Sequence, residues 1–495
     1  MASRLPSPSA QRKGCERLAQ AAPEQLAGAA PAVTAAMEAH CQDAGVQQAG
    51  CDALCAIAAG GWLDSLLAAG SVAAILAAMA AHCDSPEVQQ VSCKAVQGLL
   101  VHEGDLPALK TAAQQLQEGG FIQEVLRAIQ THAEDQRVLC SGSGALAYLS
   151  DHYILEVWEL MHECDGEGVI PILVRQMAAL SEELKPGSPE VDMAFSCLAL
   201  FANASAGSEA ARKALVQAGA VPGVLRALQF GMRDEAICSV GVMLVWNLAI
   251  GSADIKAEIV KERGMMEALA GAANATRGTD SHLQCLGFAS HALAALVDVS
   301  AEHRANLLNS DAILLVSQVL VEDSLPREGR QTAVYFLRKL AELPDARDLL
   351  RGAGAPAALI EAGARHDELF GDCSVALSYF PRADLDDLCS PSDEQRHLLA
   401  AAASRRFGLL GLLKECLSEG ATRAILGHGA ARGRYEPRSP QRFELLGGRL
   451  DHVAGGAPVR YELQRRGLGC PGVAARPAHP GLLELRHAGH RRADL

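Results

Sequence analysis

Residues 27–54 read AGAAPAVTAAMEAHCQDAGVQQAGCDAL, and residues 69–96, which begin 42 positions later, read AGSVAAILAAMAAHCDSPEVQQVSCKAV. Of the 28 aligned positions, 14 are identical. Self-similarity at a period of this length is typical of repeat proteins, in which each helical unit buries its apolar face against its neighbours. The stretch therefore predicts an array of helical repeats, and such arrays present a long surface to other molecules.

The two segments belong to a longer series of eight units, each aligned on one reference position. A large apolar residue lies two positions before every reference and, with the exception of Ser374, another lies five before. A small residue always lies six before. Positions three apart share a helix face, so the large pair predicts a buried stripe and the small residue predicts close helix approach. The reference positions are Ala59, Val101, Asp151, Asn203, Asn247, Asp298, Lys339 and Tyr379.

A second landmark follows the reference in several units. A short apolar helix is predicted to end at a glycine, after which a new amphipathic helix begins, as in ALVQAGAVPGVLRAL at 214–228. Gly219, Gly264 and Gly354 fit this turn, where a left-handed residue is needed. Each unit is therefore predicted to contain a short helix followed by two longer ones.

The segments VQQAGCDALCAIAA, VQQVSCKAVQGLLV and AICSVGVMLVWNLA resemble the helix motif of the armadillo repeat family. The resemblance covers about residues 25–380, or seven to eight repeats. It implies an all-α fold, a right-handed solenoid of three-helix units whose third helices line a concave groove. Two-helix HEAT-type repeats are the near alternative, although the glycine between the helices favours the armadillo type.

The flanking segments differ from the repeats. Residues 1–24 are predicted to be a flexible N-terminus, and the polar stretches 102–118 and 181–190 are predicted to be surface loops. Residues 381–421 are expected to be helical, and 399–421 resemble part of one ankyrin repeat. Residues 422–495 are rich in Arg, Gly and Pro and have no apolar periodicity, so we expect them to be disordered.

Composition restricts the function. The chain has a formal net charge of −14, and since residues 421–495 hold 13 Arg and 6 acidic residues, a balance of +7, residues 1–420 carry −21. This charge disfavours nucleic acid and favours a basic protein or extended peptide as the partner. The 15 cysteines form no CxxC pair, and neither a secretory signal nor a transmembrane segment is evident. We therefore expect a cytoplasmic protein, with the nucleus as the alternative location.

The resemblance also implies a set of groove residues. In armadillo repeats that bind extended peptides, an Asn at the reference position hydrogen-bonds the peptide backbone, since an amide both donates and accepts. The predicted partner-binding residues are therefore Asp151, Asn203, Asn247 and Asp298, with Met243 and Tyr335 four positions before their references. Importin-α-like receptors have Trp at that earlier position and this chain does not, which argues against recognition of nuclear signals. The competing interpretation is that these residues form only the solvated side of the third helix.

Motifs for other chemistry are weak. His40, His82 and His132 recur in register, but neighbouring repeats lie about 10 Å apart, too far to share a metal ion. The GSGALA run at 142–147 fits the small-residue register of the repeat better than a dinucleotide-binding loop. No nucleophile elbow, phosphate-binding loop or paired-carboxylate motif occurs, so we expect neither enzymatic activity nor a cofactor or metal.

The sequence therefore favours a non-catalytic scaffold or adaptor that binds a partner along an acidic concave groove. The alternative is a structural assembly component, in a cytoskeletal, ciliary or membrane-tethering complex, that contacts its partners through loops and edges. An enzyme or small-molecule sensor is the third class, and it would require a closed polar pocket.

Overall fold

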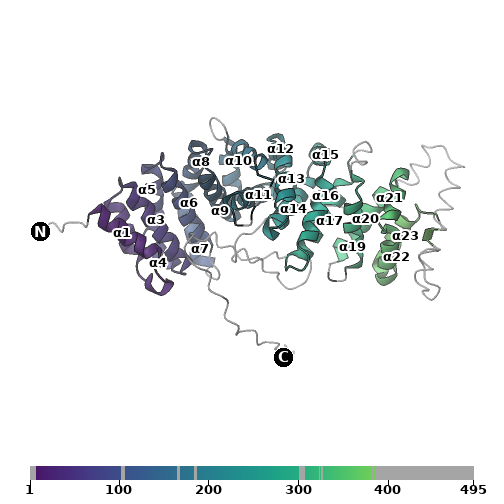
Figure 1. Ribbon diagram of the computed structural model, residues 1–495, viewed down its shortest axis with the longest axis horizontal. Helices are drawn as coiled ribbons and strands as arrows, with labels where there is room; N and C mark the ends of the chain where they lie inside the picture. Colours follow the sequence, from purple (N-terminus) through teal and green to yellow (C-terminus); the bar gives the residue numbers. More distant parts are fainter. Residues whose placement is uncertain are drawn as a thin grey trace, which may run out of the picture.

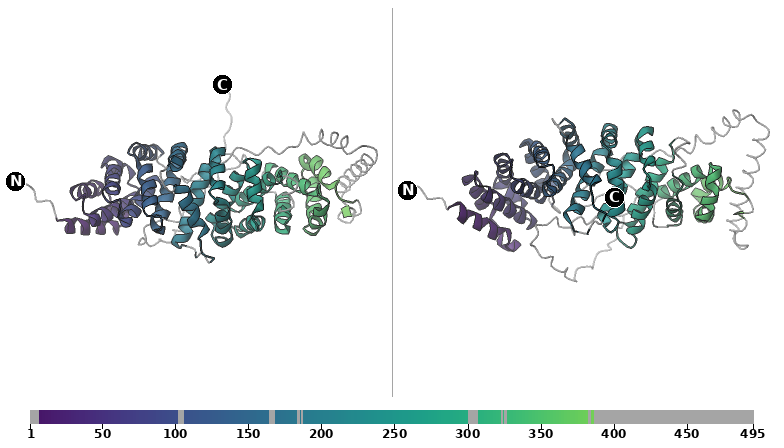
Figure 2. Two further views of the ribbon diagram at one scale, coloured as in Figure 1. Left: turned by 90° about the horizontal axis from the view of Figure 1, so that it is seen from above. Right: turned by 45° about the horizontal axis from the view of Figure 1, so that its top comes forward.

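The structure is a computed structural model that describes residues 7–101, 106–163, 168–182, 185, 187–299, 307–322, 324, 327–381 and 384–385. The regular elements among these residues are all helices. They form an elongated array, with α1 (Pro8–Ala19) at one end and α21 to α23 at the other (Figures 1 and 2). The predicted all-α solenoid is therefore confirmed.

Eight pairs of longer helices follow one another along the array. The first members of the pairs are α2 (Ala30–Ala39), α5 (Ser71–Ala81), α8 (Phe121–Thr131), α10 (Val169–Ala178), α13 (Ala220–Phe230), α16 (Met265–Ala275), α19 (Ser310–Val321) and α22 (Ala355–Arg365). The second members, called third helices below, are α3 (Ala44–Ala59), α6 (Pro86–Leu100), α9 (Gln136–Glu163), α11 (Pro189–Gly207), α14 (Glu235–Ala249), α17 (His282–Leu296), α20 (Arg327–Ala341) and α23 (Phe370–Leu377).

A further helix, shorter than the pair that follows it except in the case of α7, precedes several of these pairs and completes the three-helix repeat. These first helices are α4 (Leu63–Ala68), α7 (Leu106–Glu118), α12 (Glu209–Gln217), α15 (Ala253–Lys261) and α21 (Arg347–Gly352). The 3-10 turns η1 (Pro23–Gln25), η3 (Pro344–Ala346) and η4 (Asp367–Leu369) lie in connections. Three helices per unit, rather than two, identify the repeat as armadillo-like.

The turn between the first and second helix of a repeat requires a left-handed residue. Gly219, Gly264 and Gly354 have φ angles of 83°, 91° and 74°, and each directly precedes a second helix. A side chain would strain the backbone at such an angle. The glycine turns predicted from the sequence are therefore confirmed.

The predicted register of the third helices is also confirmed. The large residues two and five positions before each reference, such as Ile57 and Leu54, are at most 1% exposed. The small residue six before allows close contact: a Cβ added to Gly241 would lie 2.7 Å from Cδ2 of Leu228. Third helices pack against third helices and second helices against second helices along the whole described array. The core therefore runs between two layers of helices from end to end.

The N-terminal segment differs from the prediction. Residues 8–19 form α1, which packs against α3 much as α3 packs against α6, and buries Cys15. The hydroxyl of Ser7 accepts a bond from the backbone N–H of Ala10, and Pro8 begins the helix. Because the first repeat of an array lacks a preceding neighbour, α1 covers an apolar face that would otherwise meet water. The predicted flexible N-terminus is therefore wrong for this part.

The stretch 102–118 also differs from the predicted surface loop, since its larger part is the helix α7. Leu109, Ala112, Ala113 and Leu116 are at most 2% exposed. Their spacing of three and four positions places them on one helix face, which packs against α8. The prediction of a loop rested on the polar composition of the whole stretch and overlooked this apolar stripe.

Helix α9 runs past the end of its own repeat into the next. The backbone of Tyr153, with φ −132° and ψ 49°, departs from helical geometry and produces a kink. The part after the kink occupies the place of the first helix of the fourth repeat.

The predicted ankyrin-like segment 381–421 and the predicted tail 422–495 lie outside the described residues, apart from positions 381, 384 and 385. Within the described part of the chain, every helix is too short or too polar to cross a membrane.

Candidate protein-interaction surface

The reference positions lie one per repeat, on the third helices or within two residues of their ends. Helices α3, α6, α9, α11, α14, α17, α20 and α23 contact one another in sequence order (Figure 1). Each reference residue therefore lies on or just beyond a third helix that packs against the third helix of a neighbouring repeat.

Asn203 and Asn247 connect successive third helices. The Asn203 side chain on α11 donates from Nδ2 to Oγ of Ser150 at 2.9 Å and to the carbonyl of Ala147 at 3.4 Å. Asn247 on α14 donates from Nδ2 to the carbonyl of Ala202 at 3.1 Å. Both side chains are fully buried. The amide groups therefore stabilise the stacking of repeats, a role that the sequence pattern did not reveal.

The other predicted residues are placed differently. Met243 is 1% exposed and belongs to the core of α14, whereas Asp298, just beyond α17, is exposed. The side chain of Asp151 lies outside the described part of the structure. The predicted set thus divides into buried amides, a buried thioether and an exposed carboxylate.

The structure brings together one pair of predicted residues, Asp298 and Tyr335. The Tyr335 hydroxyl on α20 donates to Oδ1 of Asp298 at 2.6 Å. Burial raises the pKa of Tyr335 first, and the hydrogen bond and negative charge of Asp298 raise it further, because both disfavour the phenolate. This contact joins the third helices of two neighbouring repeats at an accessible carboxylate.

The recurring histidines have a structural explanation. Nε2 of His82 lies 2.9 Å from the carbonyl of Cys41, and Nε2 of His132 lies 2.9 Å from the carbonyl of Cys83. Each ring therefore bonds the equivalent turn of the preceding repeat. No cluster of three or more metal-ligating side chains occurs among the described residues.

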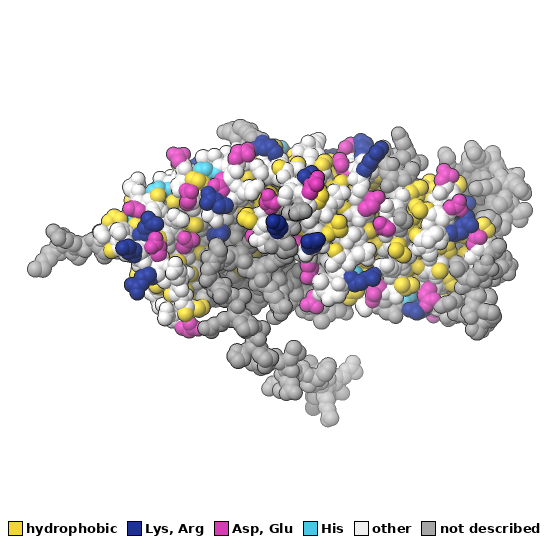
Figure 3. Space-filling model, viewed as in Figure 1, with side chains coloured by type: hydrophobic (Ala, Val, Ile, Leu, Met, Phe, Trp, Pro, Cys, Tyr) yellow, Lys and Arg dark blue, Asp and Glu magenta, His cyan; other side chains and the backbone are white. Residues whose placement is uncertain are grey.

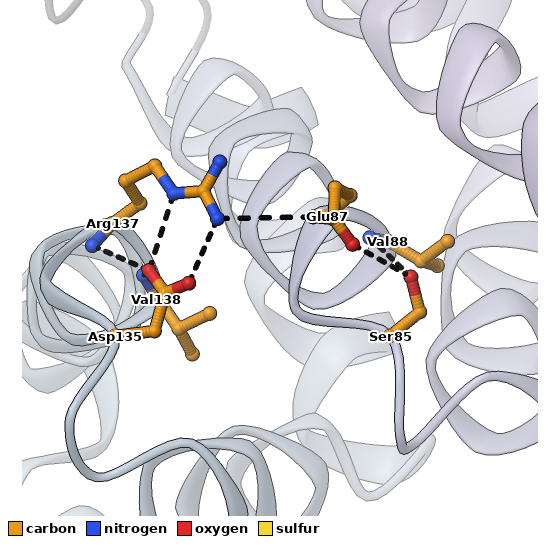
Figure 4. A network of polar contacts seen from close by, with 6 residues as sticks. All are labelled: Ser85, Glu87, Val88, Asp135, Arg137 and Val138. Carbon is orange, nitrogen blue, oxygen red and sulfur yellow. Dashed lines mark hydrogen bonds and ion pairs between the residues drawn. The ribbon is translucent and has the colours of Figure 1, made fainter.

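Charges on the visible face are interspersed rather than separated (Figure 3). One network joins the N-terminal ends of two third helices, where the Arg137 guanidinium lies 2.8 Å from Asp135 and 3.8 Å from Glu87 (Figure 4). The hydrogen bond from Arg137 lowers the pKa of Asp135. Both partners of the longer contact are about half exposed, which limits its contribution to stability.

Comparison with known proteins found similarity among solved structures. No family model matches the chain, and no curated protein matches it. Among solved structures, computationally designed armadillo repeat proteins for modular peptide recognition are similar at 18% identity over 48% of this chain and 99% of theirs, with a TM-score of 0.36. An engineered protein is similar at 18% identity over 52% of this chain and 97% of its own, with a TM-score of 0.40. With its three-helix units, glycine turns and stacked third helices, the chain is an all-α, armadillo-like solenoid.

Proposed function

We propose that this protein is a non-catalytic interaction scaffold that binds an extended segment of a partner protein along the face of its third helices. The observation that carries the proposal is the uninterrupted order of these helices, from α3 to α23. An extended peptide rises about 3.3 Å per residue, so a short segment can reach several repeats spaced about 10 Å apart.

Asp298 is the best-placed contact of the predicted set, because its carboxylate is exposed and held by the Tyr335 hydroxyl. A carboxylate fixed in this way pairs well with a Lys or Arg side chain of a partner. Asn203 and Asn247 would act differently. Their buried amides now donate to the preceding helix. To bind a partner, each would have to give up that bond and donate instead to a carbonyl of the partner backbone, which is an equivalent acceptor. Asp151 completes the proposed contact set, and Met243, which is 1% exposed, would support it from the core of α14.

The test begins with affinity purification of partners on the full-length chain. Overlapping 15-residue peptides from each recovered protein are then titrated by fluorescence anisotropy. We expect one short peptide to reproduce the binding, and Asn203→Ala combined with Asn247→Ala to weaken it about tenfold, the equivalent of one to two hydrogen bonds. Asp298→Ala should weaken binding of a basic peptide in particular.

A matched control separates recognition from stability. Gln47 and Gln89 are also buried amides that donate to carbonyl groups of a neighbouring helix, but they lie in the first two repeats, away from the proposed contacts. The variant Gln47→Ala with Gln89→Ala should lose stability and keep its peptide affinity. Equal loss of affinity in both double variants, or binding that only an intact folded partner reproduces, would refute the proposed surface.

A further inference from the structure

Helix α20 differs in charge from the third helices that precede it. It carries Arg327, Arg330, Arg338 and Lys339 against one acidic residue, Glu328. The six third helices α3, α6, α9, α11, α14 and α17 together carry two basic and nine acidic residues. The negative character of the repeat body therefore reverses at α20.

Three cationic side chains at this end of the surface lie against the rings of two tyrosines. The Arg338 guanidinium lies 5.3 Å from the centroid of the Tyr335 ring, and Nζ of Lys339 lies 5.8 Å from it. Arg347, on α21, lies 5.9 Å from the centroid of the Tyr379 ring. We call these five residues the α20–α21 cationic cluster. Helices α20, α21 and α23 are neighbours in the array (Figure 1).

The cationic side chains of the cluster are accessible to a partner. Arg338, Lys339, Arg347 and Tyr379 are all partly exposed. Lys339 pairs with Glu342 at 3.5 Å, and Nε of Arg347 donates to the carbonyl of Ala341. Three carboxylates lie close to these cations: Glu342 pairs with Lys339, Asp298 accepts from the Tyr335 hydroxyl, and Asp348, next to Arg347 in the sequence, pairs with Arg351.

We propose that the α20–α21 cationic cluster binds an acidic segment of the partner protein, so that aspartate and glutamate side chains pair with Arg338, Lys339 and Arg347. The proposal rests on the proposed function, which it makes more specific. Guanidinium groups held against aromatic rings lose little freedom when a carboxylate binds, and they can bind it through two parallel hydrogen bonds. The partner segment would then be acidic at this end of the solenoid, although the net charge of the body favours basic partners.

The experiment uses the full-length chain and three fluorescein-labelled octapeptides, (Asp-Glu)4, (Lys-Arg)4 and (Gly-Ser)4. We expect the acidic peptide to bind, with an affinity that falls as sodium chloride is raised, because partly exposed charge pairs are screened. Lys339→Glu should lower that affinity about tenfold, since it replaces attraction by repulsion.

Lys261→Glu is the matched control. Lys261 also pairs with a glutamate three positions away, Glu258 at 2.6 Å, but it lies on the first helix α15 and is about half exposed. Its reversal should leave the acidic peptide affinity unchanged. Equal effects of the two reversals would overturn the proposal, because they would report net charge alone.

The outcomes distinguish the two proposals. If (Lys-Arg)4 or a partner-derived peptide binds while (Asp-Glu)4 does not, the acidic-segment inference is wrong and the scaffold function stands. If no peptide of any kind binds the unaltered chain, the proposed surface and this inference both fail. Binding of (Asp-Glu)4 that Lys339→Glu leaves intact would place the acidic segment elsewhere and overturn the inference.

Discussion

The first two repeats and the repeats around α14, α17 and α20 share one helix order but use their polar groups in different ways. In the first two, Gln47 and Gln89 are buried, and each donates to two carbonyls at the end of the preceding helix, between 2.8 and 3.0 Å. Around α17 and α20, by contrast, Asp298 is exposed and receives the Tyr335 hydroxyl from the next repeat. The first two repeats therefore use these amides to hold neighbouring helices together, whereas the contact between α17 and α20 leaves a carboxylate at the surface.

The two regions also differ in how their third helices pack. Helices α3 and α6 contain no aromatic residue and pack through Ala, Val, Leu and Cys side chains. In the later region Trp246 on α14 stacks on Phe288 of α17, with ring centroids 5.2 Å apart, and meets His291 edge-on. Neighbouring third helices are thus held together by a few large aromatic contacts in the later region and by many small aliphatic contacts in the first two repeats.

The largest effect should come from breaking that aromatic contact. Trp246→Ala should lower the free energy of unfolding by about 3–5 kcal/mol, because it leaves a large cavity between two repeats. Urea titration followed by circular dichroism measures the loss. Ile57→Ala, in the corresponding core of α3, removes fewer buried atoms and should cost less, about 2–3 kcal/mol, and equal losses would contradict the contrast in packing.

An intermediate effect is expected at the repeated glutamines. Gln47→Ala and Gln89→Ala should each lower the free energy of unfolding by about 1–3 kcal/mol, because one buried and one partly buried carbonyl lose their donor. The two losses should be similar, since the bonds are equivalent. Hydrogen exchange at α2 and α5 would report the local opening, and exchange unchanged at both sites would contradict the assigned role.

A smaller effect, visible only at high pH, is expected at Tyr335. The folded state raises the pKa of its phenol above the ordinary value of about 10, so the proton is retained where the unfolded chain loses it. Its contribution is fully present below pH 10 and is lost as the pH rises above it. Tyr335→Phe should therefore lose less stability than the unaltered chain between pH 9 and 11, as urea titration at each pH would measure. If the free energy of unfolding changes equally with pH in both proteins, the raised pKa of Tyr335 is refuted.

The smallest effect is expected in the surface network of Figure 4. Arg137→Ala should lower the free energy of unfolding by about 0.2–1 kcal/mol at neutral pH, as is usual for exposed ion pairs. Because Arg137 lowers the pKa of Asp135, this contribution exists above the ordinary carboxyl pKa of about 4 and is lost as the pH falls below it. Urea titrations at pH 7 and pH 3 should show the difference at the higher pH only.

Much of the fold could be predicted because the repeat imposes the same packing problem eight times. The large apolar residues before each reference had to be buried, and Gly219, Gly264 and Gly354 had to adopt left-handed angles. The errors have a common cause. Helix α1 and helix α7 lack the repeat motif, and their short apolar stripes have meaning only when a neighbouring helix is present to cover them.

The candidate surface could be predicted only in part. Spacing placed Asn203, Asn247 and Asp298 in one series, but it could not distinguish a buried amide from an exposed carboxylate. That difference depends on whether a carbonyl of the preceding repeat lies within reach, as Ala202 does for Asn247. Nor did the series reveal the cations gathered around Tyr335.

The sequence by itself determined the helical repeat, its register and its glycine turns, because these follow from local periodicity and backbone sterics. Tertiary structure alone decided which polar side chains bridge repeats and which stay at the surface. Hydrogen bonds such as that from Asn203 to Ser150 join residues more than 50 positions apart, and the distance between such residues is set only when one repeat packs on the next.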